Sequence, residues 1–375
     1  MAVLTEEQSM IRDGAKSWVQ DRAPVVAFRK MRDSGAEDRF DRSVWEEMAA
    51  MGWTGILIPE AFGGTGLGYL TLGLVLEETG RTLTASPLIS TALTATTALL
   101  LGGSDAQKQK YLPQIAEGKL IATLAVDEGP HHAPEKIALA GASVGNGKMK
   151  LDGKKTFVLD GGTADLIIVA ARISGQPGDR SGVALVAVDG KAAGLTRQTL
   201  KTIDGRGYAN LAFKDVEGEM LGGGEGYGIL DATLDRARAG LAAEMLGHAA
   251  QSFELTLEYL KTREQFGQKI GTFQALQHRA AKMFTDLELA RSCVEGALSA
   301  IDRDANDIGQ LASLAKAKVG DLVHLVSNEM VQMHGGIGMT DAHDAGLYLK
   351  RARAQEATFG GSSFHRDRYA TLSGF

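Results

Sequence analysis

The spacing of apolar residues divides the chain into three parts, and the first is predicted to be helical. Up to about residue 115, apolar positions recur every three or four residues, as on one face of a helix. Thr5, followed by Glu6 and Glu7, is an expected N-cap, and Ser104 is the expected N-cap of a later helix.

From about residue 120 the spacing changes to short apolar runs bounded by Gly, Asp or Pro. These runs are LIATLAVDE, KMKLDGKKTFVL, ADLIIVAAR, GVALVAVD and ANLAFKDV. Such runs predict an antiparallel β domain. From residue 228 to 357 helical spacing returns over segments longer than an average helix, which predicts a helical bundle with room for subunit contacts.

Glycine supports this division. Of the 47 glycines, 20 fall between Lys119 and Gly228, where the turns of a β domain would need them. The predicted fold is therefore α+β, with an N-terminal helical domain (1–118), a middle antiparallel and barrel-like β domain (119–226) and a C-terminal four-helix bundle (227–375).

Composition narrows the class of protein. A chain with 44% hydrophobic and 23% charged residues can bury a core, so intrinsic disorder is excluded. The net charge of −6 without a Lys/Arg block gives no footprint for nucleic acid. One cysteine, Cys293, excludes a disulfide framework within one chain and suits a reducing, cytoplasmic location. Neither a membrane span nor a cleaved leader is expected, so the mature protein should begin near Met1.

Two segments could carry binding chemistry. In TREQFGQKIGTFQALQHR, Arg263 and Gln274 flank a glycine-containing turn and could converge on an anionic ligand. In VQMHGGIGM, Gln332 precedes Gly335 and Gly336, where a ligand could approach the backbone closely. Taken alone, each segment is better explained as a helix end, with a solvated arginine in one case and a C-cap in the other.

Together with IPEAFGGTGLG and KYLPQIAEGK, these segments resemble the acyl-CoA dehydrogenase family of flavoproteins over nearly the whole chain. The resemblance implies an α–β–α subunit with FAD held between two subunits and acyl-CoA as substrate. It also implies an electron-transfer flavoprotein-type acceptor and either a homotetramer or an α2β2 heterotetramer with a related subunit.

The resemblance assigns roles residue by residue. The implied FAD-binding residues are Arg263, Phe266, Gln274, Gln332, Gly335 and Gly336, with Phe157 in the stretch that covers the flavin. Asp235 and Arg238 match an acyl-CoA-side pair, although a salt bridge along one helix accounts for them as well. No metal site is implied.

Both positions at which this family keeps its catalytic glutamate lack an acid. Gly360 stands at the C-terminal position, and Ala237 stands at the alternative position on a helix before an arginine. No catalytic residue is therefore identifiable, and the chain is expected to be a divergent member. Candidate displaced bases are Asp127, Asp160 and Glu244; a catalytic His365 is disfavoured.

The flavin side departs from the family pattern too. Asp127 and Leu159 replace two expected hydroxyls, and an anionic Asp127 would disfavour reduced flavin unless it is protonated or turned away. The pair His131 and His132 is not expected to bind metal, because adjacent residues on a strand point to opposite faces.

Three functions remain open at this point. The chain is a working FAD-dependent dehydrogenase of acyl-CoA thioesters with a displaced base, or the base-less, FAD-sharing subunit of a heteromeric enzyme. The third is a flavin enzyme acting on a non-thioester substrate.

Overall fold

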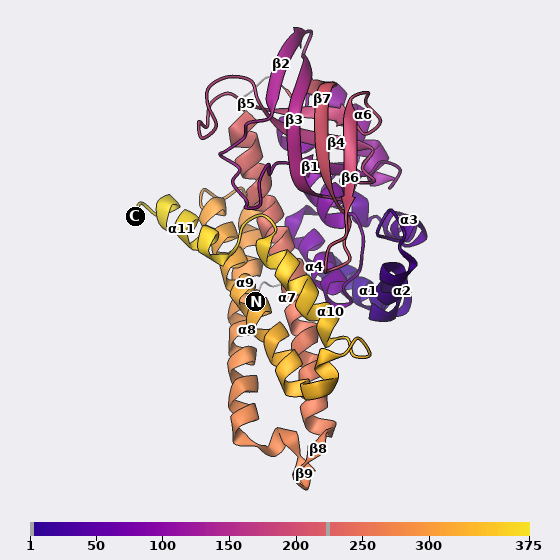
Figure 1. Ribbon diagram of the computed structural model, residues 1–375, viewed down its shortest axis with the longest axis vertical. Helices are drawn as coiled ribbons and strands as arrows, with labels where there is room; N and C mark the ends of the chain where they lie inside the picture. Colours follow the sequence, from indigo (N-terminus) through magenta and orange to yellow (C-terminus); the bar gives the residue numbers. More distant parts are fainter. Residues whose placement is uncertain (1–3, 223–225) are drawn as a thin grey trace. The chain divides into compact units, whose positions relative to one another are not determined.

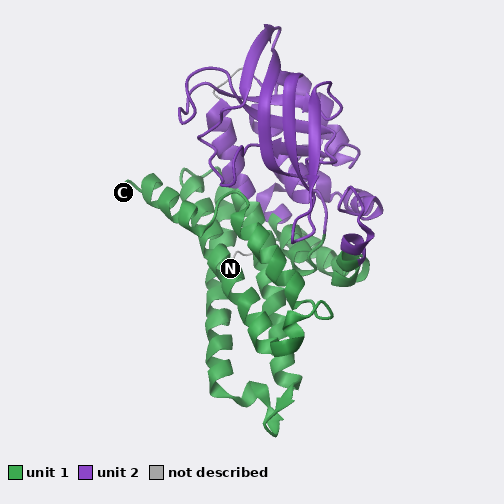
Figure 2. Cartoon of the chain, viewed as in Figure 1, with its two compact units in different colours: residues 1–29, 73–84, 238–375 green, residues 30–72, 85–237 purple. Residues whose placement is uncertain are grey.

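The computed structural model describes residues 4–222 and 226–375 (Figure 1). Contacts divide the chain into two compact units (Figure 2). Unit 1 comprises Met1–Arg29, Gly73–Thr84 and Arg238–Phe375, and unit 2 comprises Lys30–Leu72 and Ala85–Ala237. Each unit therefore draws on separate stretches of sequence, and the domain boundaries expected from the sequence stay a prediction.

The first part of the chain is helical, as predicted. Its helices are α1 (Glu6–Arg22), α2 (Val25–Ser34), α3 (Arg42–Ala50), α4 (Gly68–Arg81), α5 (Thr96–Gly102) and α6 (Asp105–Ala116), with short turns η1 (Trp53–Gly55) and η2 (Glu60–Phe62). A π-helix, η3 (Leu88–Ala95), precedes α5. Thr5 and Ser104 both cap their helices in capping boxes completed by Gln8 and Gln107, as the sequence indicates.

The middle part forms a seven-stranded sheet. Its strands are β1 (Ala122–Ala125), β2 (Ala140–Gly145), β3 (Lys148–Leu159), β4 (Leu166–Arg172), β5 (Val183–Asp189), β6 (Leu195–Leu200) and β7 (Tyr208–Met220). The pairings run β4–β2–β3–β7–β5 and return to β4, so the sheet closes on itself. Most pairs are antiparallel as predicted, but β1 and β2 pair with β4 in parallel.

The last part is again helical. It comprises α7 (Gly226–Thr262), the hairpin β8 (Glu264–Gln265) and β9 (Gln268–Lys269), η4 (Ile270–Thr272), α8 (Gln274–Asp302), α9 (Ile308–His334), η5 (Gly335–Met339), α10 (Ala345–Ala357) and α11 (Ser362–Leu372). Within unit 1, α9 packs against α8, α10 and α11. Figure 1 shows the β8–β9 hairpin at the tip of the long helices α7 and α8.

Two glycines set the crossing of α4 and α7 inside unit 1. A Cβ built on Gly247 would lie 1.7 Å from the carbonyl oxygen of Glu77, and one on Gly80 would lie 2.0 Å from that of Glu244. The two backbones are therefore in direct contact, which only glycine permits. Among the described helices, none is long and apolar enough to cross a membrane.

Candidate functional site

The first predicted binding segment forms a hairpin that projects from the end of α7. The backbone N–H of Arg263 still bonds the Tyr259 carbonyl at 2.8 Å, and the chain then turns through Phe266. Phe266 has a left-handed φ of 53° and is 91% exposed. Its ring meets Phe273 edge-on, with centroids 6.1 Å apart. Phe266 and Gly267 are the two turn residues of the β8–β9 hairpin, and both have the positive φ that a two-residue hairpin turn requires.

Three polar side chains of the two predicted segments are exposed and make no polar contact with the described residues: those of Arg263, Gln274 and Gln332. Across residues 4–222 and 226–375, no hydrogen bond or ion pair involves the side chain of Arg263, Gln274 or Gln332. Gln274 is the first residue of α8, and Gln332 lies in the last turn of α9. These donors are therefore available to an external ligand.

The structure brings both segments to the same end of unit 1. Tyr259, one turn before Arg263, stacks on His334 with ring centroids 4.3 Å apart. His334 is the last residue of α9, directly before Gly335, which has a φ of 62°, and the exposed Gly336. Burial lowers the pKa of His334, outweighing its hydrogen bond to the Met330 carbonyl. The stack joins two residues that are 75 positions apart in sequence.

Phe157, the residue expected to cover the flavin, lies near the end of β3 in unit 2. It has a left-handed φ of 50°, which is an outlier for a bulky residue, and it is 56% exposed. Its backbone N–H bonds the side-chain oxygen of Asn210 at 3.2 Å. The position has the strain and exposure of a functional aromatic residue.

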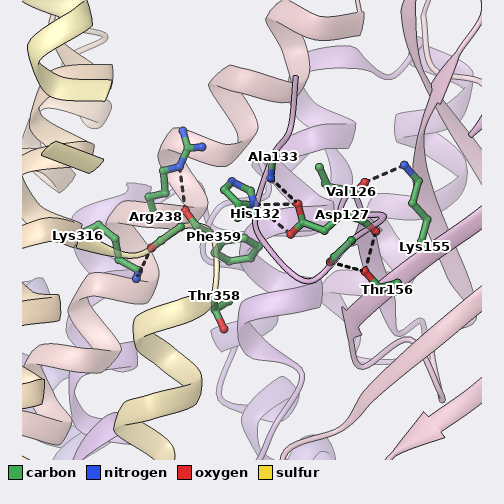
Figure 3. A network of polar contacts seen from close by, with 12 residues as sticks. Val126, Asp127, His132, Ala133, Lys155, Thr156, Arg238, Lys316, Thr358 and Phe359 are labelled. Atoms are coloured by element: carbon green, nitrogen blue, oxygen red, sulfur yellow. Dashed lines mark hydrogen bonds and ion pairs between the residues drawn. The ribbon is translucent and has the colours of Figure 1, made fainter. Parts of the chain in front are cut away.

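Asp127 is turned into its own loop (Figure 3). Its carboxylate accepts hydrogen bonds from His132 Nδ1 at 3.0 Å and from the Ala133 N–H at 3.2 Å. His131 and His132 lie in this loop and not on a strand. The expectation that they point to opposite faces of a strand is therefore wrong. Among the described residues, no group of three or more His, Cys, Asp or Glu side chains could hold a metal ion.

The partly exposed Glu128 forms an ion pair with the fully buried Lys155, a pairing that the sequence did not indicate. Lys155 is fully buried, and its Nζ donates to the Val126 carbonyl at 2.8 Å (Figure 3). The same Nζ donates to Glu128 Oε1 at 2.7 Å. Burial lowers the pKa of Lys155 to about 8 against the opposing attraction of Glu128. Glu128 also accepts from the N–H groups of Ala138 and Leu139, so it fixes the long loop before β2.

Gly360 lies in the turn Thr358–Gly361 between α10 and α11. Three side chains hold this turn from three helices of unit 1. Arg238 Nε and His365 Nε2 lie 3.4 and 3.1 Å from the Phe359 carbonyl oxygen. Lys316 Nζ donates to the carbonyls of Gln355, Glu356 and Gly360 at 3.0, 3.2 and 3.1 Å. No acid stands in the turn.

Lys316 was not identified from the sequence, where it is one lysine on a predicted helix. It is buried, and burial lowers its pKa to about 7. Ala237, expected from the resemblance to stand at the alternative base position, is fully buried in unit 2, and Asp235 is 6% exposed. Arg238 is fully buried in unit 1.

Two further candidate bases are also committed within their own units. Asp160 is buried and accepts a hydrogen bond from the Ser90 hydroxyl at 2.6 Å. Glu244 is buried and accepts from Gln355 Nε2 at 2.5 Å. The other end of that amide accepts from His248 Nδ1 at 2.7 Å, so Gln355 bridges two buried titratable groups.

Models of the acyl-CoA dehydrogenase N-terminal, middle and C-terminal domains match residues 5–119, 133–216 and 224–371. The acyl-CoA dehydrogenase IpdE2 of Mycolicibacterium smegmatis is 30% identical over 95% of this chain and 96% of its own. The chain belongs to the acyl-CoA dehydrogenase family. It is therefore an oxidoreductase of a family of FAD flavoproteins.

Two solved structures of this family are similar along almost their whole length. A Tcur3481-Tcur3483 steroid ACAD variant superposes with a TM-score of 0.90 at 31% identity, covering 98% of both chains. The ChsE4-ChsE5 complex from Mycobacterium tuberculosis superposes with a TM-score of 0.89 at 26% identity, covering 100% of both chains. The helical, β and helical order predicted from the sequence is confirmed.

The residues fit FAD unevenly. Arg263, Gln274 and the turn after Gln332 offer a guanidinium, two amides and open backbone at one end of unit 1, which suits the anionic ADP half of the cofactor. Of the residues expected beside the flavin ring, Phe157 is exposed. The carboxylate of Asp127, however, accepts hydrogen bonds from His132 and from the Ala133 N–H. The groups for the ADP half are thus present, whereas the hydroxyls expected at the flavin edge are not.

Proposed function

We propose that this chain is the base-less subunit of a heteromeric acyl-CoA dehydrogenase. It lends Arg263, Phe266, Gln274 and the turn from Gln332 to Gly336 to FAD that is seated in a related partner subunit. The reaction removes a proton from the α-carbon of an acyl-CoA and a hydride from the β-carbon, giving an enoyl-CoA. FAD supplies the hydride acceptor, and an electron-transfer flavoprotein-type protein would reoxidise it.

The observation that carries this proposal is that each candidate acid already accepts a hydrogen bond from a neighbouring residue of this chain. The turn Thr358–Gly361 holds none, while Asp127, Asp160 and Glu244 each accept hydrogen bonds inside their own unit. Loss of a positioned general base lowers the rate by about 10²–10⁴, which is about 3–5 kcal/mol of activation free energy. A partner that carries the glutamate removes this loss without any change in the present chain.

The exposure of the ADP-side residues supports the same proposal. Arg263, Phe266, Gln274 and Gln332 face away from the core of unit 1, so a second chain must cover any cofactor that they hold. The guanidinium of Arg263 would bind pyrophosphate as a fork, and Gly335 would let the cofactor approach the backbone. The ChsE4-ChsE5 relative is a complex of two differently named proteins, which makes a mixed assembly a reasonable expectation for this chain.

The acyl group is proposed from likeness alone. The Tcur3481-Tcur3483 neighbour is described as a steroid ACAD, so bulky acyl-CoA thioesters of the steroid side-chain type are the first substrates to test. Asp235 and Arg238 are the proposed acyl-CoA-side residues. A straight-chain acyl-CoA is the matched comparison substrate.

The decisive experiment expresses the chain alone and together with a related chain that has Glu at the position of Gly360 or Ala237. We expect the chain alone to show weak or no acyl-CoA oxidation with an artificial electron acceptor. The co-expressed pair should turn over and contain about one FAD per two chains, as sharing of one cofactor requires. Rapid turnover by the isolated chain, with one FAD per chain, would instead establish a homomeric enzyme with a displaced base.

Absorbance titration covers the remaining alternative. Binding of an acyl-CoA next to the flavin should perturb the flavin spectrum of the co-expressed pair. A spectrum unchanged by acyl-CoAs of every chain length, with flavin bound, would favour a non-thioester substrate.

A further inference from the structure

Gly360 has no room for a side chain. Its φ is +102°, a region that residues with a Cβ rarely adopt. A Cβ built there would lie 2.5 Å from Cδ1 and 3.0 Å from Cε1 of Phe364, and 3.1 Å from Nε2 of His365. These distances are shorter than packed carbon atoms tolerate, so either the ring or the turn would have to move.

The ring of Phe364 is held on two sides. It meets the imidazole of the fully buried His365 edge-on, with centroids 5.1 Å apart and planes at 90°. The guanidinium of Arg238 lies 5.5 Å from its centroid in a cation–π contact. Arg238 is itself fully buried on α7, so it does not yield space easily.

The backbone of the turn is held as firmly as the ring. The Phe359 carbonyl is bonded by His365 and Arg238, and the Gly360 carbonyl is bonded by Lys316. Lys316 also donates hydrogen bonds to two carbonyls in the last turn of α10, so it links the turn at Gly360 to the end of that helix. Phe359 is kept in a left-handed conformation with a φ of 57°, a strained state that these contacts must maintain.

We propose that Phe364 occupies the space into which a side chain at position 360 would project, so that the turn excludes an acid by its packing. This inference rests on the proposed base-less function and deepens it, because the packing of the turn would explain why no acid stands at position 360. A single Gly360→Glu substitution therefore does not convert the chain into a self-sufficient dehydrogenase. The acid for the reaction has to come from another chain.

The test compares thermal unfolding of the full chain with substitutions at two adjacent glycines. Gly361 has a φ of −82°, and a Cβ on it would be 3.8 Å from its nearest neighbour, so Gly361→Ala should leave Tm within about 1 °C. Gly360→Ala should lower Tm by at least about 4 °C, and Gly360→Glu should lower it further.

A second control separates backbone strain from steric exclusion. Gly52 has a φ of +79° with nothing within 4 Å of a built Cβ, so Gly52→Ala reports the backbone strain alone. Gly360→Ala should lower Tm more than Gly52→Ala does. In a Phe364→Ala background, the loss caused by Gly360→Ala should shrink toward that of Gly52→Ala, because the ring is gone and only the 3.1 Å approach to His365 Nε2 remains.

Two outcomes would overturn the inference. One is a Gly360→Glu chain with the wild-type Tm; the other is a loss from Gly360→Ala that is the same with and without the Phe364 ring. If Gly360→Glu does not fold, the comparison of Gly360→Ala with and without Phe364→Ala still tests the inference. These measurements use neither FAD nor acyl-CoA, so rapid turnover by the isolated wild-type chain would refute the proposed function without altering them.

Discussion

The ring of Tyr259 lies on the imidazole of His334, with centroids 4.3 Å apart and planes inclined by 30°. The Tyr259 hydroxyl also reaches the His334 carbonyl oxygen at 3.4 Å. This stack is the point at which the end of α7 meets the end of α9. Tyr259 therefore contributes a ring contact and a hydrogen bond to the position of the proposed FAD-binding hairpin relative to the Gly335–Gly336 turn.

Replacing Tyr259 should weaken FAD binding without removing any residue that touches the cofactor. An aromatic pair contributes about 0.5–1.5 kcal/mol beyond its buried area, so Tyr259→Ala should raise the Kd for FAD up to about tenfold. Tyr259→Phe keeps the ring and is the matched control, with Kd within about twofold of wild type. Equal FAD affinity in wild type and Tyr259→Ala would show that the stack does not position the two segments.

Removing the Arg263 guanidinium should reduce FAD affinity strongly and leave stability unchanged. A hydrogen bond to a charged group contributes about 1.5–3 kcal/mol, so Arg263→Ala should weaken FAD binding by about ten- to a hundredfold in the assembled protein. Its side chain is exposed and has no polar contact among the described residues, so Tm without FAD should stay within about 1 °C.

The neighbouring lysine provides the control for this arginine. Lys261 is also exposed and pairs with Glu258 at 2.7 Å on the same helix end. Lys261→Ala removes one positive charge near the hairpin but no proposed cofactor contact. A comparable loss of FAD affinity in both variants would indicate general electrostatic attraction instead of direct binding by Arg263.

The buried His248 should make the folded chain sensitive to acid. Burial lowers its pKa to about 4, whereas an unfolded histidine titrates near 6.5. Between these two values the unfolded chain binds a proton that the folded chain does not, so the free energy of unfolding falls as the pH drops from about 6.5 to 4. Urea unfolding at a series of pH values should show this decline.

Substitution isolates the contribution of His248 to that decline. His248→Gln keeps an N–H donor facing Gln355 and should flatten the decline between pH 6.5 and 4, although overall stability is lower. His278→Gln alters an exposed histidine on α8 and should keep the wild-type pH dependence. An unchanged slope in His248→Gln would assign the acid sensitivity to other groups.

Breaking the ion pair of Glu128 with the buried Lys155 should destabilise unit 2. Glu128→Ala leaves a fully buried ammonium without its carboxylate, which typically lowers the free energy of unfolding by about 3–5 kcal/mol. The exposed pair of Glu117 and Lys119 offers a matched comparison, because Glu117→Ala should change it by less than about 1 kcal/mol. Similar losses in urea unfolding for the two variants would contradict the importance of burial.

Local signals in the sequence predicted most elements of the fold. Thr5 and Ser104 cap the helices expected of them, and KMKLDGKKTFVL is the whole of β3. The strands β2 and β6 were not predicted, because their side chains are largely exposed and show no buried run. The parallel pairing of β1 with β4 depends on long-range contacts that no local pattern encodes.

The sequence indicated individual candidate residues, but it did not indicate which hydrogen-bond partners those residues would have. Arg263 and Gln332 were singled out from the turns beside them and Phe266 from the family resemblance; all three are exposed, and their role in binding FAD stays a prediction. The pairing of Asp127 with His132 and of Glu244 with Gln355 was not indicated, since these pairs form only after folding. Lys316 could have been noticed only as a lysine on an otherwise apolar stretch of α9, a weak signal without its three carbonyl partners.

The reciprocal contact of Gly80 with Glu244 and of Gly247 with Glu77 constrains how this protein can change over evolutionary time. Each glycine faces a backbone carbonyl of the other helix. A larger residue at either position would therefore clash with the backbone, and no substitution to a smaller side chain could relieve that clash. A larger residue at either glycine has to push the helices apart. That shift would reach Glu244 and His248, and through Gln355 the end of α10 beside the turn that carries Gly360. The close approach of α4 and α7 is therefore connected, through Glu244 and Gln355, to the helix end that precedes the turn at Gly360.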